Sequence, residues 1–151
     1  MLSAMLEPVL IADILSRHPA AKLVALADGG HPLAQQLGGI AGHAGLFSTV
    51  HDLARFAAML ARGGELDGVR VLKEETLRSF THRQPGAGTR ALGWDTMLPT
   101  SSCGTRMSPR AFGHTGFTGT SLWIDPATRA FVVFLSSRLH PDGKGDVTPL
   151  R

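Results

Sequence analysis

The chain has 151 residues, of which 43% are hydrophobic and 18% are charged, and its formal net charge is +3. This length accommodates one domain with a buried core, and the composition is that of a globular protein. The basic residues form no run of the kind that follows a phosphate backbone, so we expect no nucleic-acid partner. A single cysteine, Cys103, excludes an internal disulfide.

Residues 1–36 give few structural signals. A helix is predicted from Pro8, which suits a first helical turn, to about Ser16, and a short strand is predicted within residues 22–27. No apolar run approaches the roughly 18 residues of a membrane span. The apolar start lacks a basic region, so we expect no signal peptide, and the sequence indicates no compartment.

Residues 37–48 contain four glycines and are predicted to form a loop. His43 lies inside this loop, and we interpret it as a structural histidine held by local hydrogen bonds rather than as a catalytic one. The loop is not a phosphate loop, because no Gly-Lys-Ser/Thr follows it.

An amphipathic helix over residues 49–62 is the clearest element of the chain. Thr49 is predicted to cap it, with Asp52 beside the positive end of the helix dipole. Two consecutive glycines at 63–64 end it. Apolar residues at helical spacing predict one buried face: Leu53, Phe56, Ala57 and Leu60.

A second, shorter helix is predicted from Lys73 to His82, after a turn at residues 67–68 and an extended piece at 69–71. Glu74 and Arg78 stand four residues apart, which favours an ion pair along the helix. Leu77 and Phe80 are expected to point inward.

Four strands are predicted in the second half of the chain, at residues 91–95, 112–117, 119–125 and 130–137. A proline-containing turn joins the last two into a hairpin, and Trp94 is interpreted as a core residue. Residues 130–135 are apolar without interruption, which predicts a strand buried on both faces. We therefore predict an α+β fold, in which the 49–62 helix packs against an antiparallel sheet.

A polar segment precedes this hairpin in the chain. His114 and several hydroxyl side chains alternate there with Gly113, Gly116 and Gly119. Glycine in or beside a strand allows a ligand or a second backbone to approach closely. This segment is therefore the candidate site of the chain.

The same segment resembles the third motif of the serine hydrolases that include class C β-lactamases, penicillin-binding DD-peptidases and related esterases. In that superfamily Lys-Thr-Gly or His-Thr-Gly lies on the strand that forms one wall of the active site. The likeness continues through residues 117–126 and 137–141, and residues 37–49 also resemble the family. The resemblance implies a partial β-lactamase/transpeptidase-like fold over residues 37–141. Residues 1–36 carry no resemblance, and residues 142–151 are expected to be a flexible tail.

The resemblance also implies roles for individual residues. His114 would be the cation or donor that faces a substrate carboxylate, and Thr115 and Gly116 would line the cleft. The backbone N–H of Phe117 would complete an oxyanion hole. These four residues, His114, Thr115, Gly116 and Phe117, are the predicted catalytic site.

Two further elements of the family chemistry are missing from the sequence. The family takes its nucleophile and base from Ser-x-x-Lys and uses a Tyr-x-Asn element in proton transfer. No serine of this chain has a lysine three residues later, and the chain contains neither tyrosine nor asparagine. We therefore expect a fragment of a serine hydrolase, shortened at both ends relative to the family and inactive alone. The alternative is a non-catalytic binding or interaction module derived from that fold.

The expected ligand is a small molecule or peptide, recognised as a lactam, peptide or ester if a missing half completes the site. No cofactor is expected. No metal is expected either, because the seven histidines show no paired ligand spacing. An uncovered strand or unpaired sheet edge predicts self-association.

Overall fold

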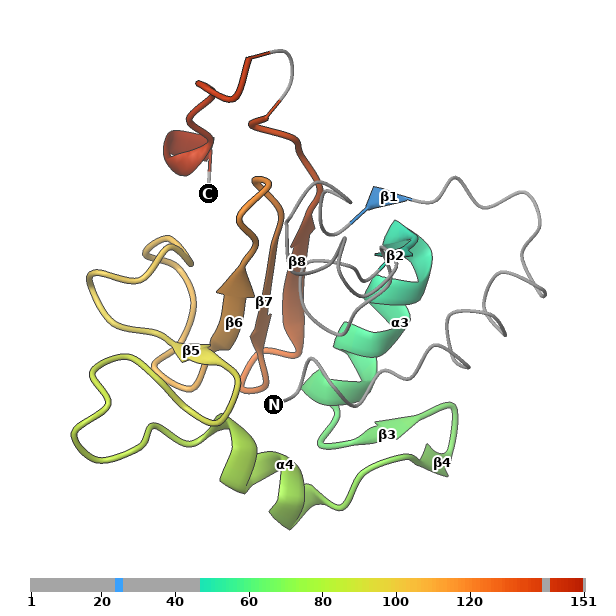
Figure 1. Cartoon of the computed structure of the whole chain (residues 1–151). Helices are drawn as coiled ribbons and strands as arrows, with labels where there is room; N and C mark the ends of the chain where they lie inside the picture. Colours follow the sequence, from blue (N-terminus) through green and yellow to red (C-terminus); the bar gives the residue numbers. More distant parts are fainter. Residues whose placement is uncertain (1–23, 26–46, 140–141, 151) are drawn as a thin grey trace, which may run out of the picture.

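The computed structural model describes residues 24–25, 47–139 and 142–150 (Figure 1). The first part of this region contains β1 (Val24–Ala25), β2 (Phe47–Ser48), α3 (Val50–Ala61), β3 (Glu65–Leu66), β4 (Val69–Arg70) and α4 (Glu74–Thr81). The second part contains β5 (Asp95–Thr96), β6 (Phe112–Thr115), β7 (Ser121–Asp125), β8 (Ala130–Phe134) and the 3-10 helix η2 (Thr148–Leu150). The predicted α+β class is confirmed.

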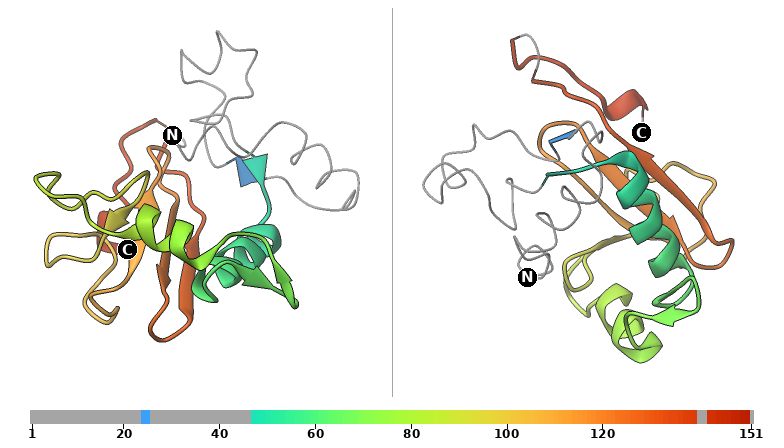
Figure 2. Two further views of the ribbon diagram at one scale, coloured as in Figure 1. Left: turned by 90° about the horizontal axis from the view of Figure 1, so that it is seen from below. Right: turned by 90° about the vertical axis from the view of Figure 1, so that its right-hand side faces the viewer.

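The main sheet is antiparallel, with strand order β5-β6-β7-β8. The long pairings are those of β7, which lies against all of β6 on one side and all of β8 on the other. Helix α3 contacts β7 and β8 and covers one face of this sheet (Figure 2). The predicted packing of the helix on the sheet is therefore confirmed.

Helix α3 begins as its sequence predicts. The Thr49 Oγ1 accepts the backbone N–H of Asp52 at 3.1 Å and donates to the Asp52 carboxylate at 2.6 Å. Its buried face includes Leu53, Ala57 and Leu60. Phe56 differs from the expectation of full burial, because it is half-buried and packs at the margin of the core.

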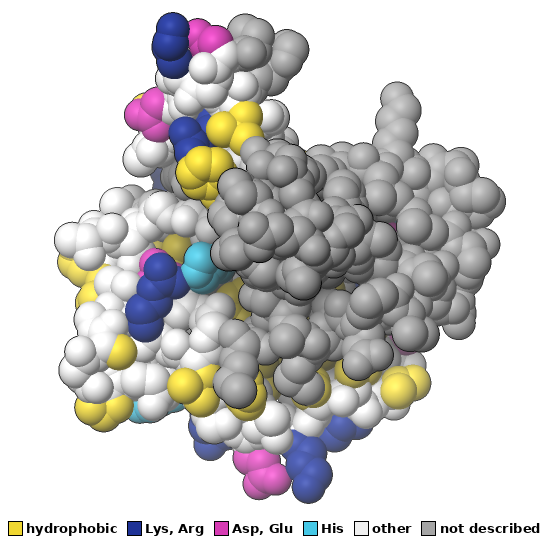
Figure 3. Space-filling model, viewed as in Figure 1, with side chains coloured by type: hydrophobic (Ala, Val, Ile, Leu, Met, Phe, Trp, Pro, Cys, Tyr) yellow, Lys and Arg dark blue, Asp and Glu magenta, His cyan; other side chains and the backbone are white. Residues whose placement is uncertain are grey.

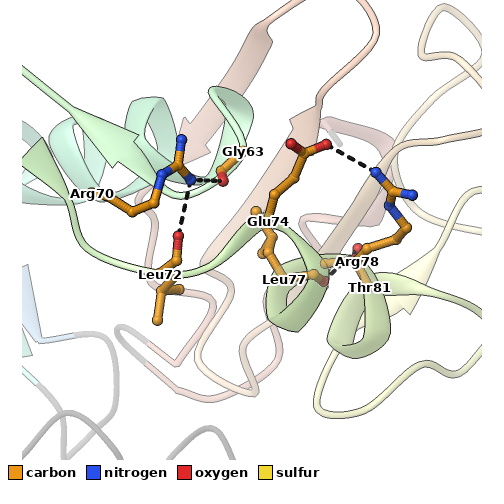
Figure 4. A network of polar contacts seen from close by, with 7 residues as sticks. All are labelled: Gly63, Arg70, Leu72, Glu74, Leu77, Arg78 and Thr81. Carbon is orange, nitrogen blue, oxygen red and sulfur yellow. Dashed lines mark hydrogen bonds and ion pairs between the residues drawn. The ribbon is translucent and has the colours of Figure 1, made fainter. Parts of the chain in front are cut away.

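The second helix is also confirmed, over Glu74–Thr81 with Leu77 buried. The Arg78 Nη2 lies 3.0 Å from the Glu74 Oε1 (Figure 4), the expected pair one turn apart. The Arg70 Nη1 donates to the carbonyls of Gly63 and Leu72, at 3.0 and 3.1 Å. The β3–β4 hairpin is thereby fastened to the end of α3.

The prediction that residues 130–135 are buried on both faces is wrong. Val132 is 53% exposed, whereas Phe131 and Val133 are half-buried. The reason is the place of β8 at the edge of the sheet, where α3 covers one face of it. Phe131 lies opposite Ile124, a core residue, while Val132 lies on the other face opposite Trp123.

The strand predicted at residues 91–95 begins later, at Asp95. Residues 92–93 form a bend in which Gly93 has φ +84°, and the Ala91 N–H donates to the Trp94 carbonyl at 2.9 Å. Trp94 is buried, as expected, and its ring meets that of Phe112 edge to face at 5.2 Å. The other strands are shorter than predicted at their ends.

Near the N-terminus the described residues are few. Val24–Ala25 lie inside the strand expected at residues 22–27. They pair with Phe47–Ser48, which form a short strand where the sequence predicts a loop. The predicted helix to Ser16 and the glycine-rich segment around His43 lie outside the described residues. Within the part of the chain that is described, no helix has the length and apolar character needed to cross a membrane.

Candidate active site

His114 and Thr115 lie where β6 extends past its neighbour β5. Strand β5 pairs with β6 through Asp95 opposite Gly113 and Thr96 opposite Phe112. Among the described residues no strand continues this pairing beside His114 and Thr115, although β7 pairs with both on the other side. His114 is exposed and Thr115 half-buried, so this end of β6 presents an accessible edge.

Hydrogen bonds fix the tautomer of His114. The Arg90 Nη1 lies 2.6 Å from its Nε2, and its Nδ1 lies 2.7 Å from the Thr115 carbonyl oxygen. A guanidinium has donors alone, so Nε2 must accept the hydrogen from Arg90. It follows that Nδ1 carries the ring hydrogen and donates it to the Thr115 carbonyl. In this arrangement Arg90 supplies the positive charge of the pair.

Arg90 reaches His114 from the loop before β5. Its backbone is held by an isolated bridge to Asp95 and by hydrogen bonds with Gln84 and Ala87. In Figure 3 a histidine side chain lies beside a basic side chain on the face that is shown. The loop therefore delivers a cation to the open end of β6.

The turn after Thr115 exposes Phe117 and buries its neighbour. Phe117 is 65% exposed, whereas Thr118 is 6% exposed. Within the described part of the chain, no hydrogen bond engages the Phe117 N–H. The guanidinium carbon of Arg138 lies 4.5 Å from the centre of the Phe117 ring, in a cation–π contact.

Asp125 anchors the chain that leads into β6. Its carboxylate is 1% exposed and accepts hydrogen bonds from the Ser108 N–H at 2.8 Å, the Ser108 hydroxyl at 2.7 Å and the Ala127 N–H at 3.0 Å. Burial by itself raises the pKa of Asp125, but these hydrogen bonds outweigh it and hold the pKa below its usual value. Asp125 therefore acts as a charged structural anchor near the Phe112 end of β6, away from His114.

Cys103 is not activated as a nucleophile. Burial raises the pKa of its thiol, a backbone hydrogen bond offsets part of that rise, and the charge of Asp95 adds to it. The described residues hold no group of three or more histidine, cysteine, aspartate or glutamate side chains that could bind a metal ion.

A cavity of about 390 Å³ lies between α4 and the base of the sheet, and Leu77, Arg83 and Phe112 are among its lining residues. None of His114, Thr115, Gly116 and Phe117 lines it. The four predicted residues instead share the exposed end of β6 and the turn that follows it.

Sequence reasoning missed Arg90 and Arg138. Nothing in the spacing of Arg90 connects it with His114, which is 24 residues away. Arg138 did carry a signal, because it lies in the segment 137–141 that resembled the hydrolase family.

The fold is shared with a β-lactamase from Mycobacterium bovis. That structure matches 78% of this chain and 50% of its own length, with 27% identity and a TM-score of 0.54. A penicillin-binding protein homologue from Caulobacter crescentus matches 58% of this chain and 26% of its own, with 28% identity and a TM-score of 0.47.

The family model described as Beta-lactamase matches residues 7–151. The chain belongs to the β-lactamase family. A protein of Salmonella paratyphi B, assigned by name to the D-alanyl-D-alanine carboxypeptidases, is 40% identical over an alignment of 109 residues that covers 69% of this chain. The chain spans about a quarter of the length of such curated relatives, since the match covers 25% of that protein.

Proposed function

We propose that the end of β6 and its following turn form the substrate-facing wall of a serine acyl-transfer site. In this proposal Arg90 binds a substrate carboxylate and His114 orients Arg90. Thr115 and Gly116 line the cleft, and the Phe117 N–H stabilises an oxyanion. Membership of the β-lactamase family supports the reaction class.

The observation that carries the proposal is the Arg90–His114 pair at the open edge of β6. Arg90 is exposed, and an exposed guanidinium is well suited to bind a planar carboxylate. His114, held as the Nδ1–H tautomer, orients that guanidinium through its Nε2. The pair therefore combines a cation with a fixed direction, which a lone exposed arginine lacks.

The substrate class follows from the same pair and from the relatives. Proteins assigned by name to the D-alanyl-D-alanine carboxypeptidases suggest a peptide that ends in D-alanyl-D-alanine and carries a free carboxylate. A lactam or an ester with a carboxylate at the corresponding position would meet the same groups.

The nucleophile and its base are not encoded in this sequence as Ser-x-x-Lys. We propose that the chain alone does not turn over an acyl substrate and that a Ser-x-x-Lys element from another polypeptide segment would complete the site. The same absence, beside a retained His-Thr-Gly, favours the second candidate function, a binding module without catalysis.

Binding can be tested on the chain alone by NMR titration of the 15N-labelled protein with N-acetyl-D-alanyl-D-alanine. We expect shifts at the amides of residues 114–117, and weaker shifts with the C-terminal amide of the same peptide. Arg90→Gln should weaken binding about tenfold, as for one lost charge-assisted hydrogen bond. Arg106→Gln, a change of an exposed arginine in another loop, is the matched control. The proposed wall would be refuted if the peptide and its C-terminal amide caused equal shifts and if Arg90→Gln bound the peptide as tightly as the wild type.

Catalysis is tested with a chromogenic ester and a fluorescent penicillin. We expect no covalent labelling and no turnover by the purified chain. Labelling of any serine would refute the proposal that the nucleophile lies outside this sequence. Turnover that appears on mixing with a segment containing Ser-x-x-Lys, and disappears in His114→Ala, would favour the enzyme over the binding module.

A further inference from the structure

The turn between β6 and β7 determines where the Phe117 N–H points. The Gly119 N–H donates to the Gly116 carbonyl at 3.1 Å, which closes a β-turn with Phe117 at its second position. The Gly116 carbonyl and the Phe117 N–H belong to one planar trans peptide, in which they point in opposite directions. Because the carbonyl points into the turn, the Phe117 N–H points away from it.

A turn with glycine at both ends does not hold this orientation by itself. Glycine has access to conformations that other residues avoid, and Gly119 adopts φ +117°. The peptide that carries the Phe117 N–H follows Gly116, so its rotation about the ψ angle of Gly116 meets little steric resistance. An external restraint is needed to keep one arrangement.

Residues 136–138, which follow β8 and are here named the strap, supply that restraint. The Arg138 Nε donates to the Phe117 carbonyl at 2.5 Å, and the Arg138 backbone N–H donates to the Thr118 carbonyl at 2.8 Å. The Ser136 hydroxyl donates to the Gly119 carbonyl at 2.8 Å. Four successive carbonyls of the turn, from residue 116 to residue 119, are thus occupied, three of them by the strap.

The side chain of Arg138 restrains Phe117 twice. Its Nε fixes the carbonyl, and its guanidinium stacks on the exposed ring. Arg138 is itself held by the Gly145 N–H, which donates to the Arg138 carbonyl at 3.1 Å. The restraint on the turn therefore originates in a part of the chain that follows the sheet.

We infer that Arg138 is a positioning residue, which holds the turn so that the Phe117 N–H stays directed at the substrate side of β6. This inference rests on the proposed function of the Phe117 N–H as an oxyanion donor. A donor of that kind is effective when it is aimed in advance, because no reorganisation is then needed during reaction. Arg138 acts through Phe117 and does not touch the substrate.

The first test measures the turn in the absence of ligand. In Arg138→Ala we expect the Gly119 N–H to exchange with solvent about tenfold faster or more, because a charge-assisted hydrogen bond to the turn is lost. The Phe117 amide resonance should shift, while exchange at Trp123 in β7 stays as in the wild type. Arg138→Gln retains a side-chain donor without the charge and should recover part of the protection. Arg106→Ala, which removes an exposed arginine elsewhere, should change neither amide.

The second test adds N-acetyl-D-alanyl-D-alanine. We expect the Phe117 amide to shift on binding in the wild type and to respond less in Arg138→Ala, with partial rescue in Arg138→Gln. If Arg138→Ala does not fold, Arg138→Gln and Ser136→Ala carry the comparison. Unchanged Gly119 exchange in all Arg138 variants would overturn the positioning role. If the wild type does not bind the peptide while Gly119 exchange still accelerates in Arg138→Ala, the proposed function is refuted and the positioning role stands.

Discussion

The variant Asp125→Asn should have a lower free energy of unfolding than the wild type at neutral pH. This difference should disappear in acid. The asparagine Oδ1 can replace the carboxylate oxygen that accepts from the Ser108 hydroxyl and the Ala127 N–H. Its amide group would then face the Ser108 N–H, so two donors meet and one buried N–H loses its acceptor. An unsatisfied buried donor costs about 1–3 kcal/mol, and we expect a loss of that size in the free energy of unfolding.

The pH dependence of this loss has a definite sign. Folding lowers the pKa of Asp125, so its contribution is fully present above the unfolded pKa of about 3.9 and is lost as the pH falls through the folded pKa. Urea unfolding of wild type and variant at pH 7, and at steps down to about pH 3, measures the difference between them. That difference should narrow below about pH 4.

Asp67→Asn is the matched control. Asp67 pairs with Arg55 on the surface, where its side chain is 62% exposed, and the change should cost less than about 0.5 kcal/mol. The reasoning is refuted if Asp125→Asn equals the wild type at pH 7, or if its loss persists unchanged in acid.

Three further predictions concern the core, the thiol and the assembly. Leu60→Ala should lower the free energy of unfolding by about 2–5 kcal/mol, because Leu60 is 1% exposed. Phe56→Ala should lower it less, because Phe56 is half-buried. Urea unfolding measures both variants, and a larger loss for Phe56→Ala would contradict the packing. Cys103 should react with iodoacetamide more slowly than free cysteine at pH 7.5 and accelerate as the pH rises, because its pKa is raised; labelling as fast as free cysteine would contradict this. The edge strand β8, with Val132 exposed, predicts self-association in light scattering over a dilution series, and a stable 16.0 kDa monomer at high concentration would contradict it.

The helices were predictable because their signals are local. Thr49 and the glycines at 63–64 mark the ends of α3, and the apolar spacing marks its buried side. The burial of β8 was not predictable, since an apolar run looks the same in a central strand and at an edge. The late start of β5 depends on a bend at Gly93 and a bridge between Arg90 and Asp95, which the alternation of residues does not encode.

The candidate site was predictable only in part. The segment from His114 to Phe117 could be found because its glycines and polar residues are consecutive. The roles of Arg90 and Arg138 could not be assigned, because folding brings them to partners that are distant in the sequence. Arg90 lies 24 residues from His114, and Arg138 lies 21 residues from Phe117. A sequence shows which residues are consecutive, whereas the direction of the Phe117 N–H depends on residues that are brought together by folding.

The strap also sets an order of events during folding. The β6–β7 hairpin can form from neighbouring residues as soon as residue 125 is available, because its pairing is local. The turn at its tip, however, receives Ser136 and Arg138 after β8 has paired with β7. During synthesis from the N-terminus, the wall would therefore acquire its final shape late, when the last residues of the sheet have left the ribosome. A chain interrupted between residues 125 and 136 would lack both strap side chains that contact the tip of the hairpin.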